Sequence, residues 1–243
     1  MTPGSLADDG WCVLPGAVDG RALEQLRHLA ESLVMLANVS VRESSGAVYA
    51  ARNVLSLVPE FQTAWKTPQL VRFIIASLGA NAGLVRGLYF DKPPTQSWAL
   101  PWHKDLLIAV EPFDSADGYS MPRPRAGVLH SEPPLSVLES MLTLRIHLDD
   151  VTPENGPLQV ATGSHTSGKE LGMEQSRVDT ILARAGDVLA MTPLLAHCSG
   201  RSHDGCESHR RILHLEFSSL PALPGGIRWY TFLPVGPVPE DDS

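Results

Sequence analysis

The sequence predicts a mainly β fold with flanking helices, in which helices from the N-terminal part pack outside one barrel or sandwich. Helical periodicity is confined to the first part of the 243 residues. Many short apolar segments, separated by turns that contain Gly and Pro, follow it. With 43% hydrophobic residues the chain can bury a core, and helices followed by many short strands are typical of this architecture.

The predicted helices lie between about residues 18 and 79. Asp19 is a candidate N-cap for a helix whose leucines repeat at three- and four-residue spacing. A second helical region covers residues 59–78 and restarts at Pro68, a residue that favours the first turn of a helix. Residues 40–58 show no clear pattern.

Strand-like segments dominate the rest of the chain, because β-branched, aromatic and leucine residues gather there in short runs between turn residues. The predicted strands lie within residues 84–91, 98–110, 142–150, 158–160, 186–191 and 210–217. Residues 112–134 are rich in Pro, Gly and charged residues, which predicts a long loop or lid. We expect such a lid to become ordered when substrate binds.

Composition narrows the class of protein. The formal net charge is −8 and there is no basic run, which argues against nucleic acid and anionic membranes as partners. No segment approaches the roughly 20 apolar residues of a membrane span. The three cysteines lack metal-binding spacing, and the N-terminus lacks the features of a signal peptide. We therefore expect a reduced, cytoplasmic protein; its oligomeric state stays open.

One His-x-Asp motif is the leading candidate for a metal site. His103 and Asp105 are two residues apart, so on a β-strand both side chains point to the same face. A second imidazole must then come from a strand that is distant in sequence, and His197 is our candidate. Two histidines and one carboxylate leave three coordination positions open, as in non-haem Fe(II) oxygenases.

A second His-x-Asp motif, formed by His147 and Asp149, competes with the first. Asp149 precedes a turn, where acidic residues commonly cap and face solvent. We therefore interpret His147 as a buried or cavity-lining histidine. Cys198 follows His197 directly, and on a strand it would point to the opposite face.

A keto-diacid co-substrate would need a cation for the carboxylate that does not bind the metal. Arginine suits this role, because its planar guanidinium binds a carboxylate through two hydrogen bonds and stays charged. Arg210 and Arg211 begin a late strand, and only one of them can face inward. Hydrophobicity alone favours the face of Arg211, but helices would make the outer face apolar too, so alternation leaves the choice open.

Several motifs resemble the phytanoyl-CoA dioxygenase family, a branch of the Fe(II)- and 2-oxoglutarate-dependent oxygenases. Residues 102–105 are similar to its His-x-Asp motif. Residues 148–165 contain Leu-Asp-Asp, Glu-Asn-Gly-Pro-Leu and Gly-Ser-His in the family's order, which is a more specific signal. Gly-Asp at 186–187 and His-Cys-Ser at 197–199 resemble its second metal motif. The resemblance extends from the N-terminal helix to about Tyr230.

The resemblance implies one domain over residues 1–243, with a double-stranded β-helix (a cupin-like jelly roll) over about residues 82–232. It implies Fe(II), 2-oxoglutarate and O₂ as the reactants that the protein uses. The implied iron ligands are His103, Asp105 and His197.

The same resemblance bears on the co-substrate. Ser199 matches a family position that contacts the keto acid. The usual arginine position is occupied here by Ser208, and matching the strand that follows favours Arg210 over Arg211. By family, His165 of the Gly-Ser-His turn is structural.

The implied reaction is hydroxylation of an unidentified small organic molecule, with release of succinate and CO₂. Asp105 favours hydroxylation over halogenation, because halogenases of this wider class carry a small residue at that position. Strand position and residue type suggest six residues that line the substrate pocket: Arg86, Trp98, Trp102, His130, Arg145 and His147. The alternative is a metal-binding cupin-like protein that does not use 2-oxoglutarate, either a small-ligand binder or an isomerase.

Overall fold

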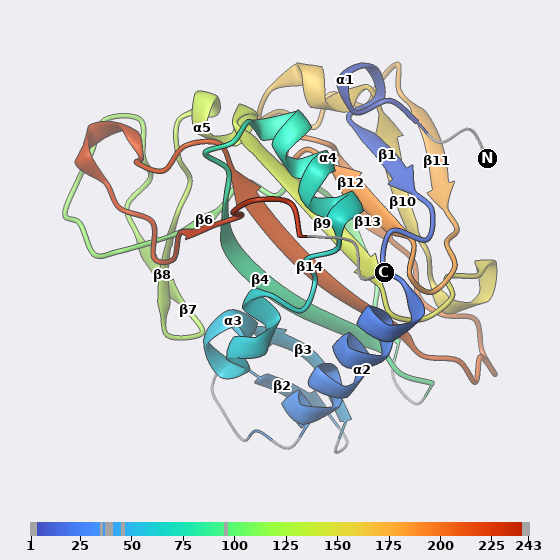
Figure 1. Cartoon of the computed structure of the whole chain (residues 1–243). Coiled ribbons are helices and arrows are strands. Elements are labelled where there is room, and N and C mark those ends of the chain that lie inside the picture. The colour runs from blue at the N-terminus through green and yellow to red at the C-terminus, as the bar shows by residue number, and fades with distance from the viewer. Residues whose placement is uncertain (1–3, 35, 37–40, 45–46, 95–96, 240–243) are drawn as a thin grey trace.

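The structure, a computed structural model, describes residues 4–34, 36, 41–44, 47–94 and 97–239. Two main β-sheets pack face to face, and helices cover the outer face of the larger one (Figure 1). The predicted mainly β fold with flanking helices is confirmed. The sheets are open, however, and do not close into a barrel: within the described residues no ladder joins their edge strands.

The helices fall mainly where helical periodicity predicts them. The α-helices are α1 (Leu6–Asp9), α2 (Gly20–Val34), α3 (Val54–Leu57), α4 (Pro68–Leu78) and α5 (Leu135–Glu139), and the 3₁₀ helices are η1 (Pro59–Gln62), η2 (Pro153–Asn155), η3 (Ser164–Ser167) and η4 (Pro224–Gly226). Thr67 caps α4 by accepting a hydrogen bond from the amide of Leu70, and Pro68 occupies its first turn. None of these helices has the length and apolar character needed to cross a membrane.

The larger sheet has helices packed against one of its faces. Its strand order is β1 (Trp11–Leu14), β12 (Val188–Met191), β9 (Met141–His147), β14 (Arg210–Ser218), β4 (Gly83–Lys92), β3 (Ala47–Arg52) and β2 (Val41–Ser44), and β15 (Leu233–Pro234) pairs with β4. Strands β2 and β3 account for part of the region that shows no clear pattern in the sequence. Leucines of α2 and the apolar face of α4 pack against the outer side chains of β9 and β14 in one buried cluster.

Alternation along β14 divides its side chains between two environments. Leu213, Leu215 and Phe217 face the helices in the main core. Arg210 and His214 point the other way and line a cavity between the sheets. The more hydrophobic set is thus on the outer face, because helices cover that face.

The smaller sheet has the order β11 (Arg177–Ile181), β10 (Leu158–Thr162), β13 (His197–Ser199) and β5 (Leu100–His103). The predicted strand 98–110 is therefore two strands, because the chain leaves the small sheet after His103. It resumes as β6 (Ile108–Val110) in a third sheet.

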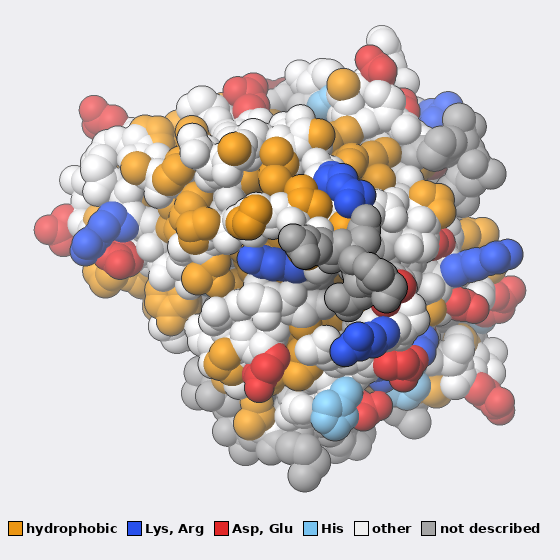
Figure 2. Space-filling model, viewed as in Figure 1, with side chains coloured by type: hydrophobic (Ala, Val, Ile, Leu, Met, Phe, Trp, Pro, Cys, Tyr) orange, Lys and Arg blue, Asp and Glu red, His pale blue; other side chains and the backbone are white. Residues whose placement is uncertain are grey.

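That third sheet corrects the prediction of a long loop over residues 112–134. Strands β7 (Arg123–Arg125) and β8 (Val128–Ser131) form a hairpin, and β8 pairs with β6. Sequence periodicity misses both strands because they are short and β7 contains a proline. On the face drawn in Figure 2, the coloured Lys and Arg side chains are scattered among acidic and apolar ones and form no continuous basic patch.

Candidate metal centre

Strand pairing in the small sheet brings together the two histidines of the predicted triad. His197 of β13 is the direct cross-strand partner of His103 of β5, and their ring centroids are 4.3 Å apart. Asp105 lies just beyond the end of β5, where its backbone N–H donates to the carbonyl of Pro193 (3.0 Å). This contact ties Asp105 to the segment that leads into β13.

The three side chains converge on one point. Asp105 Oδ1 lies 3.9 Å from His103 Nε2, and Asp105 Oδ2 lies 3.6 Å from His197 Nε2. One ligand atom from each of the three residues can be chosen so that all lie within 4.8 Å of one another. Among the described residues, this is the one group of His, Cys, Asp and Glu side chains arranged to hold a metal ion.

Backbone carbonyls orient both imidazoles. His103 Nδ1 lies 2.8 Å from the carbonyl oxygen of Pro101, and His197 Nδ1 lies 2.9 Å from that of Leu195. A carbonyl only accepts, so each Nδ1 carries the proton and donates. The lone pair of each Nε2 is then directed at the shared point, as in metal-binding histidines whose other nitrogen is hydrogen-bonded.

The electrostatics of the site suit a cation. Burial lowers the pKa of His197 to about 4, so the ring is neutral at pH 7. Burial alone would raise the pKa of Asp105, but His197, His214 and His103 around it hold that pKa well below its usual range. The Oδ2 atom of Asp105 is buried and has no hydrogen-bond partner. An orphaned carboxylate oxygen facing two imidazole nitrogens fits a divalent iron ion.

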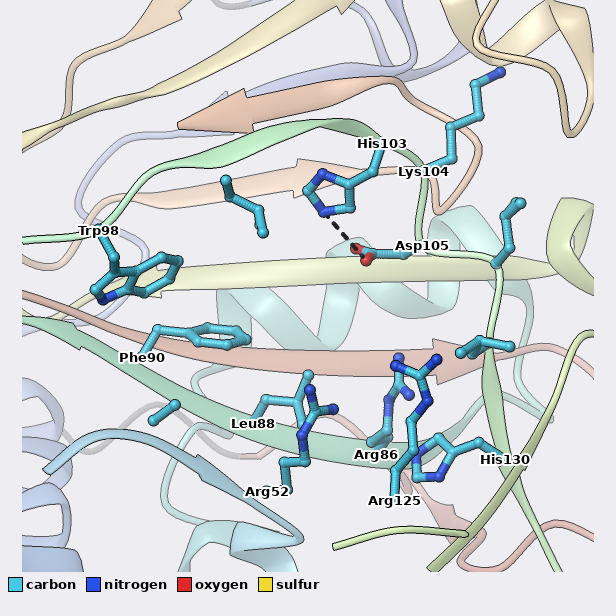
Figure 3. A pocket seen from close by; sticks show the side chains of 14 residues that line it. Arg52, Arg86, Leu88, Phe90, Trp98, His103, Lys104, Asp105, Arg125 and His130 are labelled. Atoms are coloured by element: carbon cyan, nitrogen blue, oxygen red, sulfur yellow. Dashed lines mark ion pairs between the residues drawn. The ribbon is translucent and has the colours of Figure 1, made fainter. Parts of the chain in front are cut away.

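Two cavities adjoin the triad. The small cavity lies between the sheets, and its walls include the triad together with Arg145, Ser199 and Arg210. The large cavity has a volume of about 400 Å³, and His103 and Asp105 form part of its lining (Figure 3). Its size is in the range of ordinary small-molecule sites.

Arg210 and Arg211 have different environments. Arg210 is buried, its Nε has no hydrogen-bond partner, and it pairs with no carboxylate of the described residues. Arg211 points to the opposite face, where its Nε and Nη2 donate to Asp149 (2.9 and 2.8 Å). In the second His-x-Asp motif, Asp149 therefore pairs with Arg211. His147 of the same motif is buried, and its Nδ1 lies 3.0 Å from the carbonyl oxygen of Asp187.

Lys92 is a second buried cation at the small cavity. Its ammonium donates to the hydroxyl of Ser199 (3.2 Å) and to the carbonyls of Gly156 (3.4 Å) and Gly200 (2.5 Å). Burial, together with Arg210 and Arg145, lowers the pKa of Lys92 to about 7. Because Ser199 Oγ accepts this hydrogen bond, its own proton is available to an acceptor in the cavity.

A buried polar chain links the two cavities along the large sheet. Arg145 Nη1 lies 3.0 Å from His214 Nδ1, and His214 Nε2 lies 3.1 Å from Glu216 Oε1. The same oxygen of Glu216 forms an ion pair with Arg86. Arg145 faces the small cavity and Arg86 the large one.

Four of the six predicted pocket residues line these cavities. Arg86, Trp98 and His130 line the large cavity, and Arg145 lines the small one, as does Trp98. Trp102 and His147 do not line either of these two cavities. Trp102 alternates with His103 along β5, and His147 lies at the end of β9 beyond Arg145.

Other predicted structural roles can be compared with the geometry. Cys198 Sγ points toward Gln159 Oε1 (3.5 Å) and is not part of the triad. His165 Nε2 lies 3.2 Å from the carbonyl oxygen of Ala7, which is a structural contact.

Sequence reasoning missed several residues of the site, namely Lys92, His214, Arg52 and Arg125. Alternation from Arg86 along β4 could have found Lys92, because residues 86, 88, 90 and 92 share one face. Arg125 had no such signal, since its strand was interpreted as loop.

A mainly β sandwich in which two histidines and a carboxylate meet beside a cavity defines the class of cupin-like non-haem iron proteins. The phytanoyl-CoA dioxygenase family model matches residues 6–210, and the chain belongs to this family. This membership confirms the predicted resemblance.

One relative in sequence is named as a hydroxylase. The chain is 26% identical to L-proline trans-4-hydroxylase of Streptomyces griseoviridis over 162 residues, which are 66% of this chain and 53% of that protein. The chain thus spans about half the length of this relative.

Two solved structures share the fold. EctD from S. alaskensis, with 2-oxoglutarate and 5-hydroxyectoine, has a TM-score of 0.66 at 19% identity, covering 89% of this chain and 77% of EctD. AviO1 from Streptomyces viridochromogenes Tue57 has a TM-score of 0.65 at 20% identity, covering 91% and 94% of the two chains. The predicted cupin-like jelly roll is confirmed by these neighbours.

Proposed function

We propose that the chain is an Fe(II)- and 2-oxoglutarate-dependent dioxygenase that hydroxylates a small organic molecule, with release of succinate and CO₂. The observation that carries this proposal is the orphaned carboxylate oxygen of Asp105 between two imidazole nitrogens, beside a cavity with buried guanidinium groups. EctD has been solved with Fe and with 2-oxoglutarate, which supports the same reactants here.

His103 and His197 would hold the iron through Nε2, and Asp105 through its carboxylate. Bound Fe(II), with O₂ and 2-oxoglutarate, supplies the oxidising chemistry that converts a C–H bond of the substrate to C–OH. The chain itself orients both imidazoles through their Nδ1 hydrogen bonds. It also places the large cavity directly against His103 and Asp105, where a substrate C–H bond can approach.

Arg210 and Ser199 would bind the carboxylate of 2-oxoglutarate that lies away from the metal. Arg210 presents a guanidinium that no described carboxylate neutralises, and this matches a dianion. Lys92 orients Ser199, so that its hydroxyl proton points to the bound carboxylate. Arg145 adds positive charge to the same cavity.

Hydroxylation is the reaction that we favour among those of related proteins. The carboxylate of Asp105 occupies a metal position, which argues against halogenation. L-proline trans-4-hydroxylase, a relative in sequence, is named for a hydroxylation of a small molecule. The fold neighbour SnoN is an epimerase, so the test must identify the product and not only the loss of 2-oxoglutarate.

The test measures succinate release and incorporation of ¹⁸O₂ into product, with Fe(II) added anaerobically before oxygen. We expect both to require Fe(II) and 2-oxoglutarate and to fall at least about 100-fold in Asp105→Ala, because one of three metal ligands is lost. Asp149→Ala is the matched control: it removes the acid of the other His-x-Asp motif and should keep activity. Succinate release that persists in Asp105→Ala, or an iron-loaded protein that never consumes 2-oxoglutarate, would contradict the proposal.

A further inference from the structure

The large cavity is chemically divided. One wall is apolar and includes Leu88, Phe90 and Trp98. Another carries three arginines, Arg52, Arg86 and Arg125, and in Figure 3 their guanidinium groups lie across from His103 and Asp105. A ligand that fills this space would thus have one apolar part and one part that can accept hydrogen bonds from guanidinium groups.

The charged side chains of this cavity differ in what they contribute to it. Among its described lining residues the one carboxylate is Asp105, which we assign to the iron. Arg86 is neutralised by Glu216 behind it. Lys104 contributes no charge to the cavity, because its ammonium points away and donates to the carbonyl of Ser164 (2.8 Å).

Arg125 is the cation of this wall that is best placed for a ligand. It sits at the end of β7, its side chain is exposed, and it forms no ion pair with a carboxylate of the described residues. His130, beside the same wall, is kept neutral: burial, with Arg86 and Arg52 nearby, lowers its pKa to about 4. Near pH 7 the positive charge on this wall therefore comes from guanidinium groups and not from His130.

The turn of the hairpin that carries Arg125 is hydrogen-bonded to the segment that contains Arg52. Arg125 pairs with Val128 across a two-residue turn, in which Ala126 and Gly127 both have positive φ (51° and 80°). Asn53 Nδ2 donates to the carbonyl of Ala126 (2.9 Å) and so ties this turn to the residue that follows Arg52. Asn53 is itself left-handed, with φ of 58°. Left-handed conformations at non-glycine residues persist where the surroundings enforce them, often at ligand sites.

We propose that the substrate is a small organic anion whose charged group is bound by Arg125, while its apolar part lies against Phe90 and Trp98. This proposal rests on the proposed oxygenase function and names the substrate class of that site. Guanidinium groups bind carboxylates and phosphates through paired hydrogen bonds. The anionic group would anchor one end of the molecule and direct a C–H bond at the other end toward His103 and Asp105.

The test is a binding assay that needs no turnover. Protein loaded anaerobically with Fe(II) and 2-oxoglutarate is mixed with amino acids and short alkanoic acids, each beside its own primary amide, and with the corresponding alkyl phosphates. Binding is measured by equilibrium dialysis and by thermal stabilisation. We expect acids or phosphates to bind and the amides not to, and the comparison of acids with phosphates identifies the anionic group.

Arg125→Gln should weaken binding of those anions by roughly 10- to 100-fold, the usual effect of losing a charge-assisted pair. Arg123→Gln is the control, since it removes the same charge from the same strand outside the cavity. The affinity for 2-oxoglutarate should be the same in both variants. If no anion of the panel binds more tightly to the wild type than to Arg125→Gln, the proposal is wrong. Failure of the oxygenase proposal would show separately, as absence of succinate release.

Discussion

Replacing Arg210 by methionine distinguishes two effects of this buried cation: its effect on folding stability and its role in binding 2-oxoglutarate. Burial, and then repulsion from Arg145, lower the pKa of Arg210 from the ordinary 12.5 to about 9. This difference corresponds to roughly 4–5 kcal/mol of disfavoured charge in the protein without co-substrate. Methionine has no charge and replaces only the aliphatic part of arginine. We therefore expect Arg210→Met to stabilise the unliganded protein by about 1–3 kcal/mol, part of the total because relaxation and lost contacts offset the rest.

The same substitution should damage co-substrate binding. Loss of a buried guanidinium–carboxylate pair is expected to raise the 2-oxoglutarate requirement by roughly 100- to 1,000-fold, equivalent to about 3–4 kcal/mol. Urea unfolding gives the stability, and succinate release against 2-oxoglutarate concentration gives the requirement. Saturating 2-oxoglutarate should also stabilise the wild type and leave Arg210→Met unchanged.

Arg211→Met is the matched control on the opposite face. It breaks the paired hydrogen bonds to Asp149, so it should destabilise the protein by about 1–3 kcal/mol and leave the 2-oxoglutarate requirement unchanged. The reasoning is refuted if Arg210→Met is the less stable of the two variants and binds 2-oxoglutarate normally. A raised requirement in Arg211→Met would mean that the co-substrate uses the other face of β14.

Two further predictions concern stability. Burial lowers the pKa values of His130 and His147 to about 4, so between pH 6.5 and 4 the unfolded chain binds more protons than the folded one. Stability should therefore fall as the pH drops through this window, by up to about 2.7 kcal/mol per pH unit for two histidines, and the double His→Gln variant should show a slope smaller by about two protons in urea unfolding. An equal slope in both proteins would rule out these histidines as the cause. Ala126→Gly should leave stability unchanged or raise it by up to about 1 kcal/mol, because glycine tolerates the φ of 51° at this turn. A loss above about 1 kcal/mol would show that the turn has a different conformation.

Local patterns predicted much of this molecule from the sequence. The leucine spacing of α2 and the Thr67-Pro68 start of α4 specify helices that need no tertiary information. The His-x-Asp motif at residues 103–105, with the family resemblance, identified the three residues that the structure brings together. Their role as iron ligands remains a prediction.

What the sequence could not supply depends on tertiary packing. Alternation alone could not choose between Arg210 and Arg211, because helices make the outer face of β14 the more apolar one. Asp105 lies beyond the strand and is placed by a backbone hydrogen bond to Pro193, which no spacing rule encodes. Arg125 reaches the cavity from a hairpin whose turn accepts a hydrogen bond from Asn53, 73 residues before Ala126.

The most direct measurement of the central claim is a crystal structure of the protein soaked anaerobically with Fe(II), with anomalous diffraction recorded at the iron absorption edge. We predict one anomalous peak that contacts Nε2 of His103, Nε2 of His197 and the carboxylate of Asp105. A peak elsewhere in the molecule, or a stoichiometrically bound iron that touches neither histidine, would contradict the account.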